Sequence, residues 1–291
     1  MRNYVSLIID IEKSRRYDVA ERNEMQSVMS HYAERLNDLF KENMERSVMF
    51  SGGDELQGLF ADATTAILYF RLFEILMNPV KVRAGIGIGE WTVKVQNGLS
   101  TQQDGPAYHR ARRAIQDVYK MQLQNVRICS GEDDILANHL INASIPLKRQ
   151  QIYMQNIVLV ILELLYPFVT KRMTFNNYEI VKELLSVKFE YRRGVRLLSI
   201  SAKRERSSEK ANFNINKIPI ANPIIIDGKI LELEEIIIKK NTASAISEIL
   251  GCTRQNVDSI IRRGNANKIR ELDFMALQYA EKTYGGKLWN S

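Results

Sequence analysis

The N-terminal part of the chain alternates between short apolar runs and longer segments whose apolar residues recur at helical spacing. The apolar runs predict strands at residues 4–10, 46–51, 56–60, 82–88 and 125–129. The helical spacing predicts helices at residues 19–41, 64–77 and 107–122. Residues 90–95 are interpreted as a hairpin partner of the strand before them. The predicted order is β-α-β-β-α-β with a further helix and strand, the split β-α-β order of ferredoxin-like and palm folds.

The pattern is less regular in the middle of the chain and becomes helical again at the end. It predicts helices at 133–142, 148–168 and 177–187, a strand near 195–201, and a polar loop at 203–217. Asp227-Gly228 between two apolar runs predicts a β-hairpin over 224–231. We therefore expect an α+β protein of three parts: a palm-like domain (1–132), a mixed helical and β-hairpin region (133–238) and a helix-turn-helix domain (239–291).

Charge is unevenly distributed along the 291 residues, whose net charge is +7. The first 138 residues contain 17 Lys and Arg against 19 Asp and Glu, whereas the remainder contains 24 against 15. A basic C-terminal half predicts an anionic partner, with nucleic acid the first candidate. A basic, solvated surface without any partner would have the same composition.

Cysteine spacing and hydropathy indicate a cytoplasmic protein without a membrane segment. Cys129 and Cys252 lack a neighbouring cysteine, so we predict neither a zinc site nor a disulfide framework, as fits a reducing compartment. The N-terminal apolar stretch is too short for a signal peptide and lacks its small cleavage-site residues. Glu163 and Pro167 interrupt the most apolar window, which predicts a core helix rather than a membrane-spanning one.

Two acidic residues are the first candidates for chemistry. Asp10 ends the first predicted strand, and Asp54 follows Gly52-Gly53 at the tip of the next hairpin. The predicted topology brings both carboxylates to one edge of the sheet, where oxygen ligands suit Mg²⁺ or Mn²⁺. The two glycines would let a phosphate or a metal approach the backbone. Acids at strand ends and Gly-Gly-Asp turns are also common in ordinary structure.

Four motifs together resemble the catalytic domain of class III nucleotide cyclases, over about residues 3–130. The motifs are Asp10-Ile11-Glu12-Lys13-Ser14, Phe50-Ser51-Gly52-Gly53-Asp54-Glu55, Arg83-Ala84-Gly85-Ile86-Gly87-Ile88-Gly89 and Gly105-Pro106-Ala107-Tyr108-His109-Arg110-Ala111-Arg112-Arg113. The second motif is also similar to the Gly-Gly-Asp-Glu segment of diguanylate cyclases. The set as a whole, including Asp104-Gly105-Pro106-Ala107-Tyr108, most closely resembles SatD family proteins.

The cyclase resemblance implies roles for individual residues. Asp10, the Ile11 carbonyl and Asp54 would bind the metal, and Arg113 would stabilise the transition state on an NTP. Ser14, Gly52 and Gly53 would belong to the nucleotide-binding positions, as would Phe50, where cyclases often have a base-reading Lys, and His109, where they have Asn. The resemblance also implies a homodimer in which Arg113 of one protomer faces the two aspartates of the other.

The C-terminal residues 242–264 predict a helix-turn-helix. Ala245, Ile246, Ile249 and Leu250 give the first helix an apolar face, Gly251 ends it and Thr253 begins the second helix. The second helix presents residue types that contact bases and phosphates of double-stranded DNA: Arg254, Gln255, Asn256, Ser259 and Arg263. A helical hairpin that binds another protein is the alternative interpretation.

The sequence therefore predicts a metal-dependent, nucleotide-binding protein with cyclase-like activity, coupled to DNA binding through its C-terminal helices. The alternative is a catalytically inactive regulator that senses a nucleotide and binds DNA. A polymerase-type or nucleotide hydrolase reaction and a purely structural role for the acids also remain open.

Overall fold

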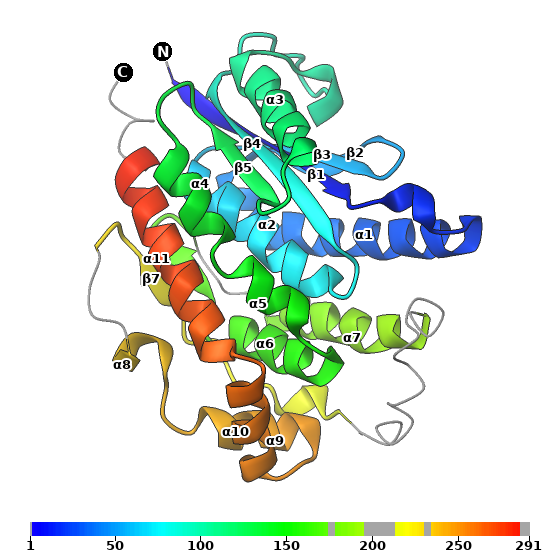
Figure 1. Cartoon of the computed structure of the whole chain (residues 1–291), viewed down its shortest axis with the longest axis vertical. Coiled ribbons are helices and arrows are strands. Elements are labelled where there is room, and N and C mark those ends of the chain that lie inside the picture. Colours follow the sequence, from blue (N-terminus) through cyan, green and yellow to red (C-terminus); the bar gives the residue numbers. More distant parts are fainter. Residues whose placement is uncertain (1, 174–177, 195–212, 230–233, 286–291) are drawn as a thin grey trace.

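The computed structural model describes residues 2–173, 178–194, 213–229 and 234–285, and it has a mixed α+β architecture (Figure 1). A five-stranded sheet contains β1 (Asn3–Ile11), β2 (Met44–Gly52), β3 (Glu55–Phe60), β4 (Val82–Glu90) and β5 (Val126–Cys129). Its order is β2-β3-β1-β4-β5, so the first strand lies between the hairpin strand β3 and β4. Only the β4–β5 pair is parallel among these described strands. The strands predicted from the apolar runs are thus confirmed to within a few residues.

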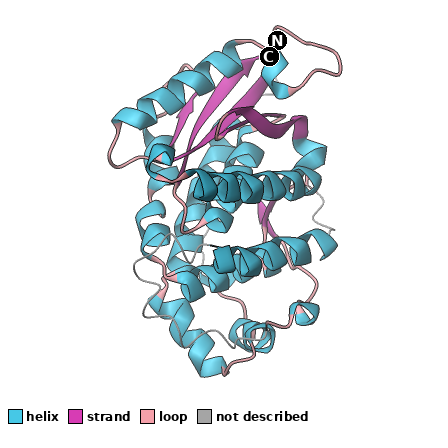
Figure 2. Ribbon diagram, turned by 90° about the vertical axis from the view of Figure 1, so that its right-hand side faces the viewer, coloured by secondary structure: helices cyan, strands magenta, loops and turns pink. Residues whose placement is uncertain are grey.

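Helices cover both faces of this sheet (Figures 1 and 2). The helices α1 (Val19–Phe40) and α2 (Ala63–Met77) contribute to one large hydrophobic core with Leu7, Ile9 and Ile11. On the opposite face, Ile8 packs with residues of α3 (Pro106–Lys120). Because side chains alternate along a strand, Asp10 shares the face of Ile8 and points toward α3.

The glycines of the Arg83–Gly89 motif allow α3 to pack unusually close to β4. A Cβ atom at Gly87 would lie 2.1 Å from the Ala107 carbonyl oxygen and from the Ala111 nitrogen. A Cβ atom at Gly85 would lie 2.4 Å from the Ala111 carbonyl oxygen. Real Cβ atoms do not approach the backbone this closely, so these two positions require glycine. Close helix–strand packing therefore accounts for the glycines at these positions without any role in ligand binding.

The prediction of a hairpin partner for β4 at residues 90–95 is wrong. Both edges of β4 are already paired, with β1 and with β5. Residues 91–105 instead form a loop beside β2 and β3, in which Val93 makes an isolated bridge with Asp104. The Gln57 side chain of β3 donates a 3.0 Å hydrogen bond to the Ser100 carbonyl and ties this loop down.

The middle region packs beneath the sheet and along the edge of β5. Two asparagines of α4 (Ile135–Asn142) hydrogen-bond to the backbone of this edge strand. Asn138 Oδ1 accepts from the Ile128 amide at 2.7 Å, and Asn142 Nδ2 donates to the Val126 carbonyl at 2.8 Å. These contacts satisfy backbone groups that would otherwise be unpaired at the sheet edge.

The helix predicted at 148–168 is two helices followed by a strand. These elements are α5 (Ile145–Gln150), α6 (Tyr153–Leu165) and β6 (Phe168–Thr170). Gln151 breaks the helix in an extended conformation, and Pro167 directly precedes β6. The helix predicted at 177–187 is α7 (Tyr178–Gly194), whereas the strand predicted at 195–201 lies outside the described residues.

The predicted hairpin at 224–231 is only partly described. Its first strand, β7 (Ile224–Ile226), pairs in parallel with β6. Residues 230–231 of its expected return strand are outside the described ranges, as is the part of the predicted 203–217 loop before residue 213. The end of that loop contains a short 3₁₀ helix, Ile215–Lys217.

The C-terminal helices share the hydrophobic core of the sheet rather than forming a separate one. They are α8 (Glu234–Ile237), α9 (Thr242–Leu250), α10 (Arg254–Arg263) and α11 (Ala266–Tyr284). Side chains from β1 to Tyr284 belong to one contiguous buried cluster. Across the described ranges, we find no helix with the length and apolar character needed to cross a membrane.

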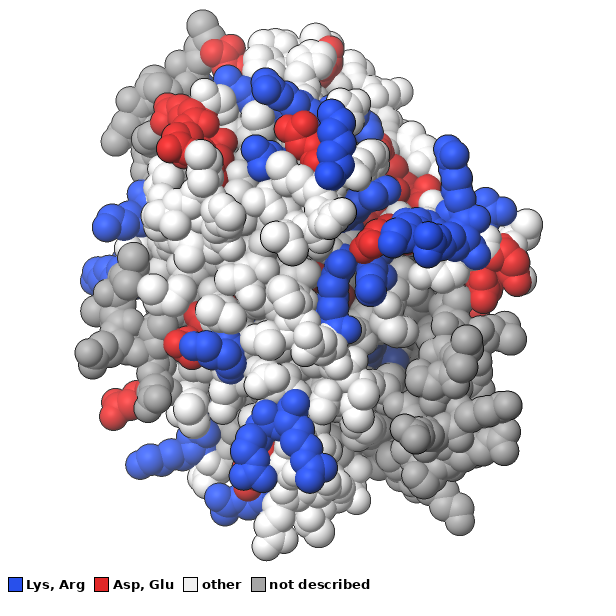
Figure 3. Space-filling model, in the orientation of Figure 1, with Lys and Arg blue, Asp and Glu red and all other residues white. Residues whose placement is uncertain are grey.

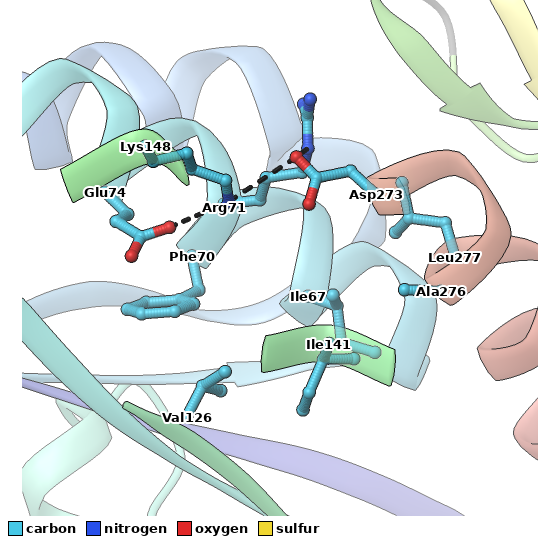
Figure 4. A pocket seen from close by; sticks show the side chains of 10 residues that line it. All are labelled: Ile67, Phe70, Arg71, Glu74, Val126, Ile141, Lys148, Asp273, Ala276 and Leu277. Carbon is cyan, nitrogen blue, oxygen red and sulfur yellow. Dashed lines mark hydrogen bonds and ion pairs between the residues drawn. The ribbon is translucent and has the colours of Figure 1, made fainter. Parts of the chain in front are cut away.

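A buried network of charged side chains joins α2, α5, α6 and α11. Arg71 binds both carboxylate oxygens of Glu163 at 2.6 Å and Asp273 Oδ2 at 2.6 Å. Arg270 lies 2.7 Å from Glu163, and Lys148 lies 2.9 Å from Glu74. Together, these three cations and three anions balance in charge. Figure 4 shows Arg71, Glu74, Lys148 and Asp273 beside a small cavity that also has apolar lining residues.

Candidate functional site

Asp10 lies at the C-terminal end of β1 and is held by a cation and a phenol. Its carboxylate is 8% exposed and lies opposite Arg83 in the β1–β4 register. Arg83 donates to Asp10 Oδ2 at 2.9 and 3.1 Å, and the Tyr119 hydroxyl of α3 donates to the same oxygen at 3.1 Å. The Arg83 guanidinium also stacks 3.7 Å from the centre of the Tyr119 ring. Asp10 Oδ1 has no hydrogen bond within the described residues.

Asp54 lies at the tip of the β2–β3 hairpin, close enough to Asp10 for the two charges to repel. Burial raises the pKa of Asp10 most strongly, and the negative charge of Asp54 raises it further against the opposing effect of Arg83. Asp54 Oδ2 is buried and has no hydrogen-bond partner in the described part of the chain. Gly53 adopts φ +58°, which forms the turn, and its carbonyl accepts a 2.9 Å hydrogen bond from Gln26 of α1.

Glu55 and Arg112 form an ion pair beside the two aspartates. The sequence analysis did not single out this ion pair. Arg112 contacts both carboxylate oxygens of Glu55, at 2.7 Å for Oε1, and Ser51 Oγ donates to Oε1 at 2.5 Å. The Glu55 contact raises the pKa of Arg112, and the Asp10 charge contributes to the same shift. Arg112 is therefore the arginine that α3 directs toward this site within one chain.

The other predicted site residues lie at the surface or against the core. Arg113 and His109 are exposed on α3, and the His109 ring lies 3.3 Å from Asp104. Arg113 makes no hydrogen bond or ion pair with the described residues, so its approach to a second protomer stays a prediction. Ser14 begins a 3₁₀ helix (Ser14–Arg16) after Lys13, and Phe50 packs partly buried against the hydrophobic core.

The residues at this sheet edge fit a hard divalent cation. Asp10 and Asp54 are two repelling carboxylates, one with an unpartnered buried oxygen, and Ile11 ends β1 beside them. Mg²⁺ and Mn²⁺ are bound by such sets, usually with water and substrate phosphates completing the coordination. Within the described ranges, no three His, Cys, Asp or Glu side chains converge as metal ligands.

A SatD family model matches residues 4–188, which is more than half of the chain. The chain belongs to the SatD family. No curated protein matches it. The SatD match includes the five-stranded sheet and the whole Asp10–Asp54 site, and it ends within α7. The helices α9, α10 and α11 lie beyond the matched residues.

The C-terminal helices of this SatD protein place a polar helix at the surface. Gly251 ends α9 at φ +63°, and the Thr253 hydroxyl caps α10 by accepting from the Asn256 amide. Val257 anchors α10 in the core. The exposed side chains include Arg254, Gln255, Asn256, Arg262 and Arg263, with Ser259 partly buried. Figure 3 shows Lys and Arg side chains gathered over α9 and α10, whereas the area over α4 and α11 is mostly uncharged.

We expect Asp10→Asn to stabilise the metal-free SatD protein at pH 7. A raised pKa means that the folded state disfavours the ionised carboxyl, so the contribution of Asp10 is full below its unfolded pKa and is lost above its folded one. Asn would remove this cost and the repulsion from Asp54, so a higher Tm is expected, by roughly 2–4 °C for each 1 kcal/mol gained. Calorimetric scans at pH 7 and pH 3 test this, since the advantage should shrink as the pH falls below 3.8, the ordinary pKa of an Asp carboxyl. A lower Tm at pH 7 would contradict it.

Proposed function

We propose that this SatD protein binds a nucleoside triphosphate with Mg²⁺ or Mn²⁺ at the Asp10–Asp54 edge of the sheet. The observation that carries the proposal is the convergence of two carboxylates, one of them with a buried and unpartnered oxygen. The strand order β2-β3-β1-β4, in which neighbouring strands are antiparallel, is the order expected of a ferredoxin-like or palm domain. The cyclase-like motifs at Asp10 and Asp54 support the same ligand.

The roles of the side chains follow from their charges and positions. Asp10, Asp54 and the Ile11 carbonyl would hold the metal, which when bound supplies a Lewis acid for phosphate oxygens. Arg112 and the exposed basic residues Lys13, Arg15 and Arg16 offer charge to a polyphosphate. The exposed Gly52–Gly53 tip leaves space for phosphates, because nothing lies within 4 Å of a Cβ built at either position.

Nucleotidyl cyclase-like turnover is the first candidate activity, and sensing without turnover is the second. The specific observation favouring the sensor is the Arg83–Asp10 ion pair, because the guanidinium already neutralises the carboxylate that a catalytic metal would use. Phe50 also packs against the core at the position where cyclases often carry a base-reading Lys. In the sensing version, the bound metal nucleotide changes the DNA-binding output of the chain without product release.

The decisive experiment is product analysis with the four NTPs, each with Mn²⁺ and with Mg²⁺, separated by mass spectrometry. A cyclic or linked nucleotide should form and should fall by more than about 100-fold in Asp54→Ala, because a metal ligand is lost. Asp38→Ala, an exposed aspartate on α1, is the matched control and should retain activity. No turnover with retained Mn²⁺–NTP binding would establish the sensor instead, and no nucleotide binding at all would overturn both.

Duplex DNA is the partner that we propose for α10. The capped helix, its buried anchor Val257 and its exposed Arg, Gln and Asn side chains support a role for α10 as a recognition helix. The basic group over α9 and α10 provides the phosphate contacts on which DNA affinity depends. A symmetric dimer would present two such helices to one duplex.

A further inference from the structure

The short helix α5 is linked by side chains to four separate parts of the molecule. Ser144, directly before it, donates to Asp273 of α11, and Lys148 pairs with Glu74 of α2 at 2.9 Å. Arg149 Nη2 lies 2.8 Å from Glu12 Oε2. Gln151, directly after the helix, donates a 2.7 Å hydrogen bond to the Gly264 carbonyl. Figure 1 shows α5 between the sheet above it and α6 and α10 below it.

Two of these links connect α5 to the two proposed binding sites. Glu12 is two residues after Asp10, in the segment that contributes the Ile11 carbonyl and Ser14 to the proposed metal–nucleotide site. Gly264 is the residue at which α10 ends, so the Gln151 hydrogen bond fixes the C-terminal end of that helix. Arg149 and Gln151 are only two residues apart. Arg149 contacts the segment of the proposed metal–nucleotide site, and Gln151 contacts the end of the proposed DNA-binding helix.

The helix between these contacts is held rigidly. Ser144, Lys148 and Gln151 are each less than 9% exposed. Lys148 also lies 3.4 Å from Asp273, which α11 contributes from the C-terminal helices. Breaking one buried partner away from such a set is costly, so α5 moves together with α11 rather than sliding past it. A displacement at Arg149 would therefore reach α11 through Lys148 and the end of α10 through Gln151.

Among the side-chain contacts of α5, the Glu12–Arg149 ion pair is the easiest to break. Glu12 and Arg149 side chains are 21% and 25% exposed, so their ion pair is much cheaper to break than the buried links. Asp10 is paired with Arg83, so a cation held by Asp10 and the Ile11 carbonyl would compete with Arg83 for the carboxylate next to Glu12. In this structure Glu12 holds Arg149. A ligand that binds more tightly to a state without this ion pair would favour that state.

We propose that α5 couples the metal–nucleotide site to the DNA-binding helix through the Glu12–Arg149 ion pair. This inference rests on the proposed function, since it assigns regulation to the same two sites. Linkage requires reciprocity, so Mn²⁺ changes the affinity for DNA by the same factor by which DNA changes the affinity for Mn²⁺. A coupling factor of about 5-fold or more is expected.

The test uses the full chain, MnCl₂ alone as the ligand and a fluorescent 30-base-pair duplex. The duplex Kd is measured by anisotropy with and without Mn²⁺, and the Mn²⁺ Kd by calorimetry with and without duplex. In Arg149→Gln, the coupling factor should fall below about 2-fold while each single-ligand Kd stays within about 2-fold. Arg35→Gln is the matched control, because Arg35 has a similarly exposed side chain, 30% against 25% for Arg149, and forms an ion pair between α1 and α7.

The outcomes separate the coupling from the function on which it rests. An unchanged coupling factor in Arg149→Gln, or an equal loss in Arg35→Gln, would overturn the coupling and leave both binding sites standing. Failure of the parent chain to bind Mn²⁺ or duplex would overturn the proposed function and the coupling with it. Backbone hydrogen exchange adds a structural readout: Mn²⁺ should change the exchange of α10 amides in the parent and not in Arg149→Gln.

Discussion

Replacing Glu163 by Gln is expected to lower the free energy of unfolding by about 3–5 kcal/mol. Glu163 is 3% exposed and binds both Arg71 and Arg270. Its removal leaves three buried cations, Arg71, Arg270 and Lys148, for two carboxylates, Asp273 and Glu74. An uncompensated buried charge is the costliest local change available in this core. The corresponding fall in Tm is roughly 6–20 °C.

Thermal and denaturant unfolding of Glu163→Gln measure this effect, and Glu248→Gln is the matched control. Glu248 lies in an exposed ion pair with Lys217, 4.0 Å apart, so its loss should cost at most about 1 kcal/mol. Equal losses in the two variants would show that the buried network does not stabilise the fold.

The stability of the network should also depend on pH in a known direction. Burial alone would raise the pKa of Glu163, but Arg270 and Arg71 more than offset it and the pKa is lowered. A lowered pKa contributes stability above the unfolded-state value and loses it as the pH falls through the folded-state value. The gap between the parent and Glu163→Gln should therefore narrow in acid.

The combined change Arg254→Ala and Arg263→Ala is expected to weaken duplex binding by at least roughly 30-fold. Both side chains are exposed on α10, so their removal costs little stability. If each contacts a phosphate, the slope of log Kd against log salt should fall by about 2. Anisotropy titrations of a labelled duplex at several salt concentrations measure both quantities.

The control for this pair is Arg15→Ala with Arg16→Ala, which removes the same charge from an exposed 3₁₀ helix far from α10 in the chain. This control should retain most of the duplex affinity. Duplex binding that is equally weak in both double variants would indicate general charge attraction. Unchanged binding in the α10 variant would contradict the proposed role of α10 as a recognition helix.

Periodicity was sufficient for most of the fold because the elements have strong local patterns. The helix expected at 19–41 is α1, and Asp18 and Glu21 form a capping box at its start. Helical periodicity failed at Gln151, where the backbone becomes extended and the buried side chain hydrogen-bonds to Gly264, a residue distant in sequence. The prediction of a strand at 90–95 failed because the free edge of β4 is taken by β5, which is distant in sequence.

The candidate site could be predicted only for residues fixed by motif and topology. Asp10 and Asp54 could be predicted because each lies at the end of a predicted strand. The contact of Arg83 with Asp10 could not, because it depends on the β1–β4 register between residues 73 positions apart. Arg112 and Arg113 are adjacent on one helix, and only the packing of α3 decides which of them faces Glu55. For the buried network, the available signal was a charged residue within an apolar helix, such as Glu163 of α6 or Arg71 of α2, because an unpaired buried charge would be very costly.

The shared core sets limits on how the C-terminal helices can diverge between relatives. Arg270 and Asp273 belong at once to α11 and to the charge balance beneath the sheet, so substitutions there require compensating changes in α2 or α6. Selection for a new binding preference is then confined to the outward positions of α10. The C-terminal helices evolve as part of this scaffold and cannot be exchanged as an independent module.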